Sequence, residues 1–404
     1  MLPSSPLIPE VKGSGARPYW SVMIPTYNPR ADYLEETLRS VLAQDPGPDQ
    51  MQIEVVDDGS TDNTVCEVIR RIGAGRVTFH AQSQNRGLAN TWNRCIEQAR
   101  GNLVHILHQD DIVLSGFYDH LRKGAEESDA GAIFCRHAWT NAKGHWTSLS
   151  ELHRETAGLL DDWHAGISAN QFIQNAKGHW TSPSKLHRET AGLFDDWHAR
   201  ITVNQFIQSP AIVVRRSVYE HVGGFRPQLN FTLDWEMWQR IAAQYSFWFE
   251  PSILACYRKH GTSASSRLEL QDNHVRDLRM TIDITTAYHP PRVGSVLARK
   301  ARALWAGWVI SNSQHLLVQG HPGAARRQVL EALRMSRSPT VLRQVASLLV
   351  LWARIAGARL KCRFRSILRR TPETQAKAQI ESQSSTARER PSARCRCPGL
   401  GVID

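Results

Sequence analysis

The 404-residue sequence lacks the cysteine patterns of a disulfide-stabilised or zinc-binding protein. Its seven cysteines are scattered and irregularly spaced, and no CxxC pair occurs among them. An odd number of scattered cysteines argues against a disulfide framework, and the absence of CxxC pairs argues against a zinc site. We therefore expect a protein of the reducing cytoplasm.

Long hydrophobic runs are also absent. No run of about 18 apolar residues occurs, so no segment is predicted to span a bilayer as a helix. Residues 1–17 are rich in Pro, Ser and Gly and contain no apolar core of a secretory signal, so we expect a flexible lead.

Acidic residues are scarce in the C-terminal part of the chain. The formal net charge is +11, and Arg accumulates after residue 266, whereas the preceding part mixes both signs. A basic appendage on a mixed-charge body fits an anionic membrane surface at least as well as a nucleic acid. We predict peripheral contact with the inner face of the cell membrane and no nucleic-acid partner.

Short apolar runs alternate with helical patterns in the first 111 residues. The predicted strands lie within 20–25, 51–60, 76–82 and 102–111, and the predicted helices within 33–44, 62–72 and 87–100. The strands are apolar throughout rather than alternating, which is typical of an α/β fold with a mostly parallel sheet covered on both faces. The polar turns PTYN, DDGSTD and HQDD follow three of these strands and should converge on one ligand-binding crevice.

A tandem duplication interrupts the next part of the chain. Residues 141–174 recur as 175–208, and the two copies differ at six positions. Two near-identical copies indicate a recent duplication rather than a stacked helical repeat. One copy is predicted to be an insertion, and the sequence leaves open which copy has the parental position.

The remainder is predicted to be helical and then disordered. A domain of residues 18–266 would carry a basic helical extension, 267–370, and a disordered tail, 371–404. Residues 340–370 are apolar with Arg and Lys toward the end. This segment fits a helix in the bilayer interface and equally a helix that packs on the preceding domain.

Two acidic pairs lie at the predicted strand ends. Asp110 and Asp111 would repel each other unless a cation lies between them, and oxygen ligands in a loop suit Mg²⁺ or Mn²⁺. Carboxylates at Asp57 and Asp58 can accept hydrogen bonds from a nucleoside. Each pair taken alone fits a solvated or structural turn better than a ligand site.

Five motifs in order change this balance. IPTYNP, EVVDDGSTDNT, NRGLANTWNRCIEQARGNLVHILHQDD, GGFRPQLNFTLDWEMWQRIA and YRKHGTSAS together resemble the family 2 glycosyltransferases of the GT-A fold. The resemblance covers roughly Trp20 to Ser266. It implies an inverting transfer from a nucleotide-sugar donor to a saccharide or lipid-linked acceptor, with Mg²⁺ or Mn²⁺ as cofactor, in surface polysaccharide synthesis.

The resemblance also implies roles for single residues. The residues implied at the donor nucleotide and its sugar are Pro25, Thr26, Tyr27, Asp57, Asp58, Arg86, Asn93 and Asp110. Asp111 would hold the metal, and His260 would approach the metal or the diphosphate. Asp234 would be the general base, with Glu236 as its neighbour.

The residues around Asp234 support this role independently. Asp234 begins an amphipathic helix between aromatic residues, and partial desolvation raises the proton affinity of a carboxylate. The acid that often precedes the base in the family is Leu233 here, which leaves the choice between Asp234 and Glu236 open. His105 and His108 are interpreted as structural.

Two other functions fit less well. A glycoside hydrolase would place two carboxylates around one bond without a metal. A catalytically impaired homologue that only binds the nucleotide sugar is the stronger alternative, because the duplication lies in the acceptor half.

Overall fold

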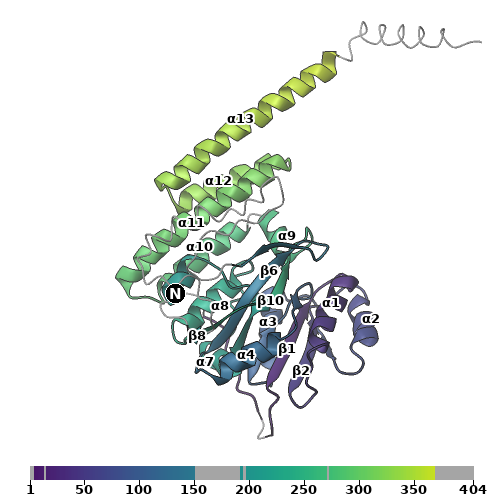
Figure 1. Cartoon of the computed structure of the whole chain (residues 1–404). Helices are drawn as coiled ribbons and strands as arrows, with labels where there is room; N and C mark the ends of the chain where they lie inside the picture. The colour runs from purple at the N-terminus through teal and green to yellow at the C-terminus, as the bar shows by residue number, and fades with distance from the viewer. Residues whose placement is uncertain (1–3, 13–14, 151–191, 194–196, 271–272, 369–404) are drawn as a thin grey trace, which may run out of the picture.

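The computed structural model describes residues 4–12, 15–150, 192–193, 197–270 and 273–368 (Figure 1). An α/β domain with one sheet carries helices on both faces, and a helical extension leads away from it toward the C-terminus. The predicted α/β fold with a C-terminal helical extension is confirmed.

The first four strands form the parallel part of the sheet. They are β1 (Trp20–Thr26), β2 (Met51–Asp57), β3 (Thr78–Ala81) and β4 (Leu103–Ile106). β2 and β4 pair with β1, and β3 pairs with β2, all in parallel. The intervening helices are α1 (Ala31–Leu42), α2 (Thr64–Ile72) and α3 (Leu88–Gln98). The order predicted from the apolar runs is therefore confirmed.

The second part of the sheet is mixed. It contains β5 (Ile112–Val113), β6 (Ala132–Thr140), β7 (Trp146–Leu149), β8 (Gly192–Leu193), β9 (Ile212–Arg215) and β10 (Phe247–Arg258). Strand order is β3-β2-β1-β4-β9-β6-β10-β5, with β7 beside β6 and β8 beside β10. β9 runs antiparallel to both its neighbours, whereas β6 and β10 are parallel.

Helices follow the strands and continue into the extension. In the domain they are α4 (Phe117–Glu126), α6 (Trp197–Val203), the 3₁₀ turn η1 (Ser209–Ala211), α7 (Arg216–Val222) and α8 (Leu233–Ala242). The later ones are α9 (Ala264–Leu270), α10 (Asn273–Thr286), α11 (Pro291–Val318), α12 (Pro322–Met335) and α13 (Pro339–Leu368).

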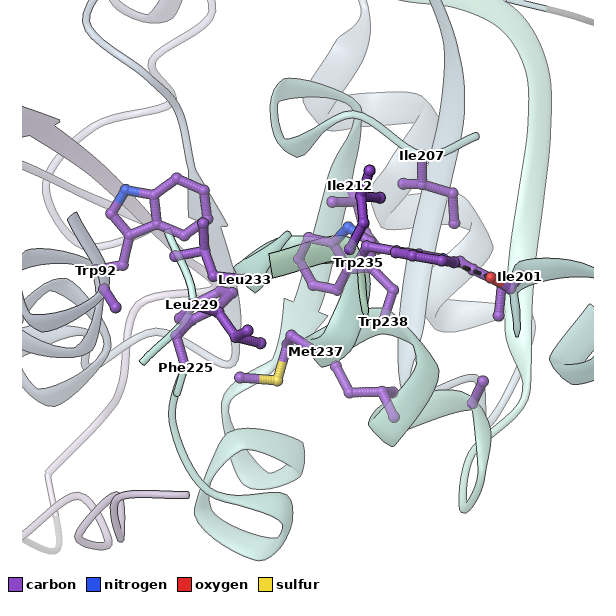
Figure 2. Packing of buried hydrophobic residues seen from close by; sticks show 14 of the residues in the cluster. Trp92, Ile201, Ile207, Ile212, Phe225, Leu229, Leu233, Trp235, Met237 and Trp238 are labelled. Carbon is purple, nitrogen blue, oxygen red and sulfur yellow. Dashed lines mark hydrogen bonds between the residues drawn. The ribbon is translucent and has the colours of Figure 1, made fainter. Parts of the chain in front are cut away.

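Two apolar cores cover the two faces of the sheet. Val22 and Ile24 of β1 pack with α1, α2 and α4, whereas Met23 between them points into the core that contains α3 and α8. Figure 2 shows part of this second core, where Trp235 of α8 lies beside Ile201 of α6. The same core continues into α10, α11 and α12, so the first helices of the extension share the domain's hydrophobic interior.

The described residues of the duplicated segment come from the start of the first copy and the end of the second. The start of the first copy, 141–150, contains β7, which pairs with β6. The end of the second copy includes α6, whose Ile201 and Val203 are buried. The remaining residues of both copies, 151–191 and 194–196, lie outside the described residues.

Helix α13 has two different faces in its first half. Val341 and Leu348 are buried in the shared core, whereas Leu342, Leu349 and Val350 are about half exposed. Packing on the preceding helices therefore accounts for one face and leaves a second, apolar face uncovered. Among the described residues, none of the helices combines the length and the apolar character needed to cross a bilayer.

The predicted lead has defined contacts in residues 4–12. Ile8 is 5% exposed in the core. The carbonyl of Pro6 accepts the backbone N–H of Gly224 at 2.8 Å, and the carbonyl of Pro9 accepts the guanidinium of Arg216 at 2.8 Å. The predicted disordered tail, 371–404, lies outside the described residues.

Candidate active site

The turns after β1, β2 and β4 meet at one edge of the sheet, as predicted. Thr26 Oγ1 donates to Asp57 Oδ1 at 3.1 Å, which joins the ends of β1 and β2. The backbone N–H of Tyr27 donates to Gln109 Oε1 at 2.8 Å, which joins the turns after β1 and β4. A cavity of about 1720 Å³ opens above these turns and extends to α8 and α11.

The cavity separates the predicted site residues into two groups. Those that line it are Pro25, Thr26, Tyr27, Asp58, Asp110, Asp234 and His260. Those outside its lining are Asp57, Arg86, Asn93, Asp111 and Glu236.

Asp57 and Asp58 have different partners. Asp57 accepts hydrogen bonds from Thr26 and from the backbone and hydroxyl of Ser60, at 2.5–3.1 Å, and so closes the turn. Asp58 accepts the backbone N–H groups of Arg86 and Gly87 at 2.7 and 3.0 Å. Asp58 therefore anchors the loop before α3 and also faces the cavity.

A glycine makes this close approach possible. Gly59 has φ of +73°, and a Cβ atom there would lie 2.8 Å from the backbone carbon of Gln84. The left-handed conformation and the lack of space both require glycine directly after the acidic pair.

Arg86 and Asn93 face away from the cavity. They line a separate recess of about 570 Å³. The side-chain amide of Asn93 donates to the carbonyl of Phe225 at 2.8 Å and accepts its N–H at 2.6 Å. Asn93 thus ties α3 to the segment before α8, and any contact with a nucleotide stays a prediction.

Asp111 follows Asp110 in the turn but is buried, and it does not line the cavity. It is 1% exposed, and its Oδ1 accepts the backbone N–H of Arg258 at 2.8 Å. Its Oδ2 lies 3.2 Å from Nδ1 of His108 but accepts no aligned hydrogen bond. Burial raises the pKa of Asp111 to about 6, against the lowering effect of His108.

His108 completes a compact cluster that the sequence interpretation missed. One ligand atom each from His108, Asp110 and Asp111 lies within 4.8 Å of the others, and Nε2 of His108 has no hydrogen-bond partner. Burial lowers the pKa of His108, but Asp111, Asp110 and more distant carboxylates raise it by more. The signal in the sequence was a histidine three residues before Asp111 in the same strand-end turn.

His260 lies beside Asp110 rather than beside Asp111. Its Nε2 is 2.7 Å from Oδ2 of Asp110, and its Nδ1 is 3.0 Å from the hydroxyl of Thr262. Arg258, two residues earlier at the end of β10, donates to the carbonyl of Asp110 at 2.9 Å. β10 and its following loop are therefore fixed to the acidic turn.

The arrangement around His105 is structural, as predicted. His105 is fully buried between the hydroxyl of Tyr118 at 3.2 Å and the carbonyl of Pro210 at 3.1 Å. Burial lowers the pKa of His105 to about 3, which keeps the ring neutral.

Asp234 and Glu236 occupy opposite environments on α8. Asp234 lines the cavity, and its carboxylate accepts Gln205 Nε2 at 3.0 Å and the backbone N–H of Trp235 at 2.7 Å. Burial raises the pKa of Asp234 to about 6 despite these hydrogen bonds.

Glu236 is fully buried and faces away from the cavity. Its carboxylate accepts Arg226 at 2.9 Å, Arg240 at 2.6 Å and the hydroxyl of Tyr288. Burial alone would raise the pKa of Glu236, but Arg240 and Arg226 lower it by more. Arg240 belongs to α8 itself and the other two partners to neighbouring segments, so Glu236 ties α8 to the segment before it and to the segment after α10.

This site lies in a recognisable sequence family. The sequence pattern of the family described as glycosyl transferase family 2 matches residues 21–223, which are half of the chain. The chain belongs to glycosyl transferase family 2. It is therefore a glycosyltransferase, as the motifs indicated.

The relatives of this family 2 member are diverse. An uncharacterised protein of Mycobacterium tuberculosis, MT1568, is 26% identical over 79% of this chain and 90% of its own length. A GalNAc(5)-diNAcBac-PP-undecaprenol beta-1,3-glucosyltransferase of Campylobacter jejuni is 33% identical over 28% of this chain and 36% of its own. The match to glycosyltransferase GlyG of Streptococcus pneumoniae spans 37% of that protein. The chain thus spans little more than a third of these two named enzymes.

A solved structure shares the fold. S. aureus TarS 1–349 in complex with UDP-GlcNAc superposes with a TM-score of 0.50 at 16% identity, over 78% of this chain and 89% of that one. At this identity the likeness shows the GT-A fold of the domain.

Proposed function

We propose that this glycosyltransferase inverts the anomeric centre while it transfers a sugar from a nucleotide-sugar donor to a saccharide or lipid-linked acceptor. The observation that carries the proposal is the position of Asp234. Its carboxylate lines the same cavity as Asp58 and Asp110, whereas Glu236 is held in a buried ion pair outside it. One acid is thus available to an acceptor and the other is not.

Asp234 would act as the general base. A general base must be ionised before the reaction, and it must be basic enough to take the proton from the acceptor hydroxyl. A pKa of about 6 at Asp234 serves both requirements near neutral pH. Direct attack of that oxygen opposite the leaving diphosphate inverts the anomeric carbon.

The donor nucleotide would bind at the ends of β1 and β2. Pro25, Thr26 and Tyr27 would line the base, and Asp58 keeps acceptor capacity toward the nucleoside. Asp57 would act by holding the turn in place. Arg86 and Asn93 would support the loops behind the nucleotide.

We propose that His108, Asp110 and Asp111 hold Mn²⁺ or Mg²⁺. The buried Oδ2 of Asp111 and Nε2 of His108 have no hydrogen-bond partner, which fits atoms that serve as ligands. An ion held by these residues would neutralise negative charge on the leaving diphosphate. An imidazole among the ligands favours Mn²⁺, because Mg²⁺ prefers oxygen ligands and water. His260 would orient Asp110 through their 2.7 Å contact.

Three further observations support the proposed acceptor, location and activity. The name of the C. jejuni relative includes an undecaprenol-linked acceptor, which supports a lipid-linked acceptor and a role in surface polysaccharide synthesis. The exposed apolar face of α13 supports peripheral contact of a cytoplasmic enzyme with an anionic membrane. The intact contact between Gln205 and Asp234 favours an active enzyme over an impaired homologue.

The proposal is tested with a donor screen followed by one substitution. UDP-, GDP- and dTDP-sugars are screened with Mn²⁺ for thermal stabilisation, since a ligand that binds only the folded state raises its stability. Asp234→Asn should keep donor binding and lose transfer by about 10²- to 10⁴-fold. Asp119→Asn, at an exposed aspartate of α4, is the matched control. Transfer by Asp234→Asn at the wild-type rate, or no stabilisation by any donor, would overturn the proposal.

A further inference from the structure

Gln109 lies in the chain between His108 and Asp110 of the proposed metal cluster, but its side chain contacts the turn after β1. The backbone N–H of Tyr27 donates to Gln109 Oε1 at 2.8 Å, and Gln109 Nε2 donates to the carbonyl of Tyr27 at 3.4 Å. The carboxamide thus pairs with both polar groups of the Tyr27 backbone, as a residue of a neighbouring strand would. One side chain therefore joins the turn of the proposed metal cluster to the turn proposed to line the base.

Asn28, directly after Tyr27, has a backbone conformation that needs support from its surroundings. Its φ is +44°, in the left-handed region, where residues other than glycine are uncommon. Its backbone N–H donates to Ser60 Oγ at 2.8 Å, and its Oδ1 accepts the backbone N–H of Thr61 at 2.8 Å. These bonds hold Asn28 against the turn after β2. The turn after β1 is therefore held on two sides, by the turn after β2 and by Gln109.

The backbone on both sides of Gln109 would be restricted when the proposed metal site is filled. His108 and Asp110 are proposed ligands on either side of Gln109, so their bonds to an ion would fix the peptide units that carry it. The carboxamide of Gln109 would then fix the Tyr27 backbone. A nucleoside whose base lies against Tyr27 restricts the same turn from the cavity. When two ligands order the same segment, the ligand that binds second loses less conformational entropy and binds more tightly.

We propose that Gln109 couples the metal site to the nucleoside site, so that Mn²⁺ and the nucleoside each bind more tightly when the other is bound. The inference rests on the proposed function and adds a positioning residue to it. The coupling passes through the protein and needs no bond between the ion and the diphosphate of the donor. It therefore persists for a nucleoside without phosphate, which is uncharged and so has little direct electrostatic interaction with the ion.

The test uses nucleosides, because they occupy the base site without offering a phosphate to the ion. The full-length protein is titrated with Mn²⁺, and the free ion is measured by EPR with and without saturating uridine, guanosine or thymidine. At least one nucleoside should tighten Mn²⁺ binding about fivefold or more. Calorimetric titration of that nucleoside, with and without Mn²⁺, should give the same factor, because coupling between two binding sites is reciprocal.

Substitutions of Gln109 separate the coupling from binding itself. Gln109→Ala removes the contact with Tyr27 but keeps the three proposed metal ligands, so each ligand alone should bind with close to wild-type affinity, and the coupling factor should fall to about 1. Loss of a merely structural contact would instead weaken both affinities and leave the coupling factor unchanged. Gln109→Asn, whose carboxamide is one methylene shorter, should lose the coupling in the same way and keeps the test valid if Gln109→Ala fails to fold.

A control and two contrary outcomes complete the test. Gln50→Ala, at an exposed glutamine directly before β2 and outside the cavity lining, is the matched control and should keep the full coupling. If Mn²⁺ and a nucleoside both bind the wild-type protein without coupling, or if the coupling is unchanged in both Gln109 variants, Gln109 does not have this role. A wild-type protein that binds no Mn²⁺, or none of the nucleosides even with Mn²⁺, would instead overturn the proposed function at its metal site or its donor site.

Discussion

Gln205 donates a hydrogen bond of 3.0 Å from Nε2 to Oδ2 of Asp234, and Gln205 belongs to the second copy of the duplicated segment. A residue of the duplication is thus in direct contact with the proposed base. The same copy contributes Ile201, whose carbonyl accepts Trp235 Nε1 at 2.6 Å (Figure 2). The duplication consequently supports the candidate site instead of lying apart from it.

Removal of one repeat length should leave the enzyme folded and active. Deletion of residues 158–191 joins Ala157 to Gly192 and restores a single 34-residue unit, because Gly158 and Gly192 are equivalent in the two copies. The start of the first copy and the end of the second, which make the described contacts, both remain. We expect an unchanged Tm to within about 1–2 °C, which corresponds to about 1 kcal/mol for a chain of this size, and wild-type donor binding. Deletion of residues 192–208, which removes α6, is the control and should prevent folding.

The pH dependence of transfer should report on Asp234. The base must be ionised, and burial raises its pKa to about 6, so kcat should fall as the pH drops below about 6. The hydrogen bond from Gln205 stabilises the charged form and lowers this pKa. Gln205→Leu should therefore move the acid limb of the kcat profile to higher pH. If the acid limb of the Gln205→Leu profile stays at the wild-type pH, the group whose ionisation limits kcat is not Asp234.

Removal of His108 should weaken metal binding. Its Nδ1 lies 3.2 Å from Asp111 Oδ2, so the His108→Ala variant loses a ligand or the group that positions one. We expect the affinity for Mn²⁺, measured by EPR or calorimetry, to fall about 10- to 100-fold. His221→Ala, at an exposed histidine hydrogen-bonded to Tyr245, is the control. Equal Mn²⁺ affinity in His108→Ala and His221→Ala would remove His108 from the site.

Local patterns predicted the parts of the site that lie on consecutive strand ends. Apolar runs gave the order of β1, β2 and β4, and the parallel arrangement brought Asp58 and Asp110 to one cavity. The contacts that distinguish Asp234 from Glu236 were not predictable in this way. Arg226 and Arg240 lie within ten residues of Glu236, but the third partner, Tyr288, comes from the segment after α10, and Gln205, the partner of Asp234, comes from the duplicated segment.

The inner wall of the cavity was beyond sequence reasoning for the same reason. Trp305 and Trp308 lie on a helix whose pattern indicates packing, and the space between α8, α11 and α13 depends on how these helices meet. The duplication showed the opposite limit. Its two copies are almost identical, so the contacts of Gln205 with Asp234 and of Ile201 with Trp235, rather than the sequence, indicate which end serves the site.

Glu236 should contribute strongly to stability and little to chemistry. It is 0% exposed, and Arg226 and Arg240 around it are 7% and 5% exposed, so its loss leaves two buried cations without a counter-charge. Glu236→Ala should lower the free energy of unfolding by about 3–5 kcal/mol, measured by denaturant titration. Glu97→Ala, which breaks the exposed pair with Arg94, should cost less than about 1 kcal/mol. Folded Glu236→Gln that transfers sugar no faster than Asp234→Asn would instead give Glu236 a role in catalysis.

Binding to anionic vesicles should depend on the exposed face of α13. Leu342 and Leu349 are 49% and 59% exposed on this helix. Insertion of this face into the interface buries apolar area, and neighbouring Arg residues add attraction to anionic lipids that falls with salt. A Leu342→Glu/Leu349→Glu double variant should bind phosphatidylglycerol vesicles about tenfold or more weakly in a flotation assay, since each buried leucine contributes about 1.5–3 kcal/mol. Leu330→Glu on α12, at a position 48% exposed, is the matched control. Equal binding by both variants would remove the apolar face of α13 as the membrane contact.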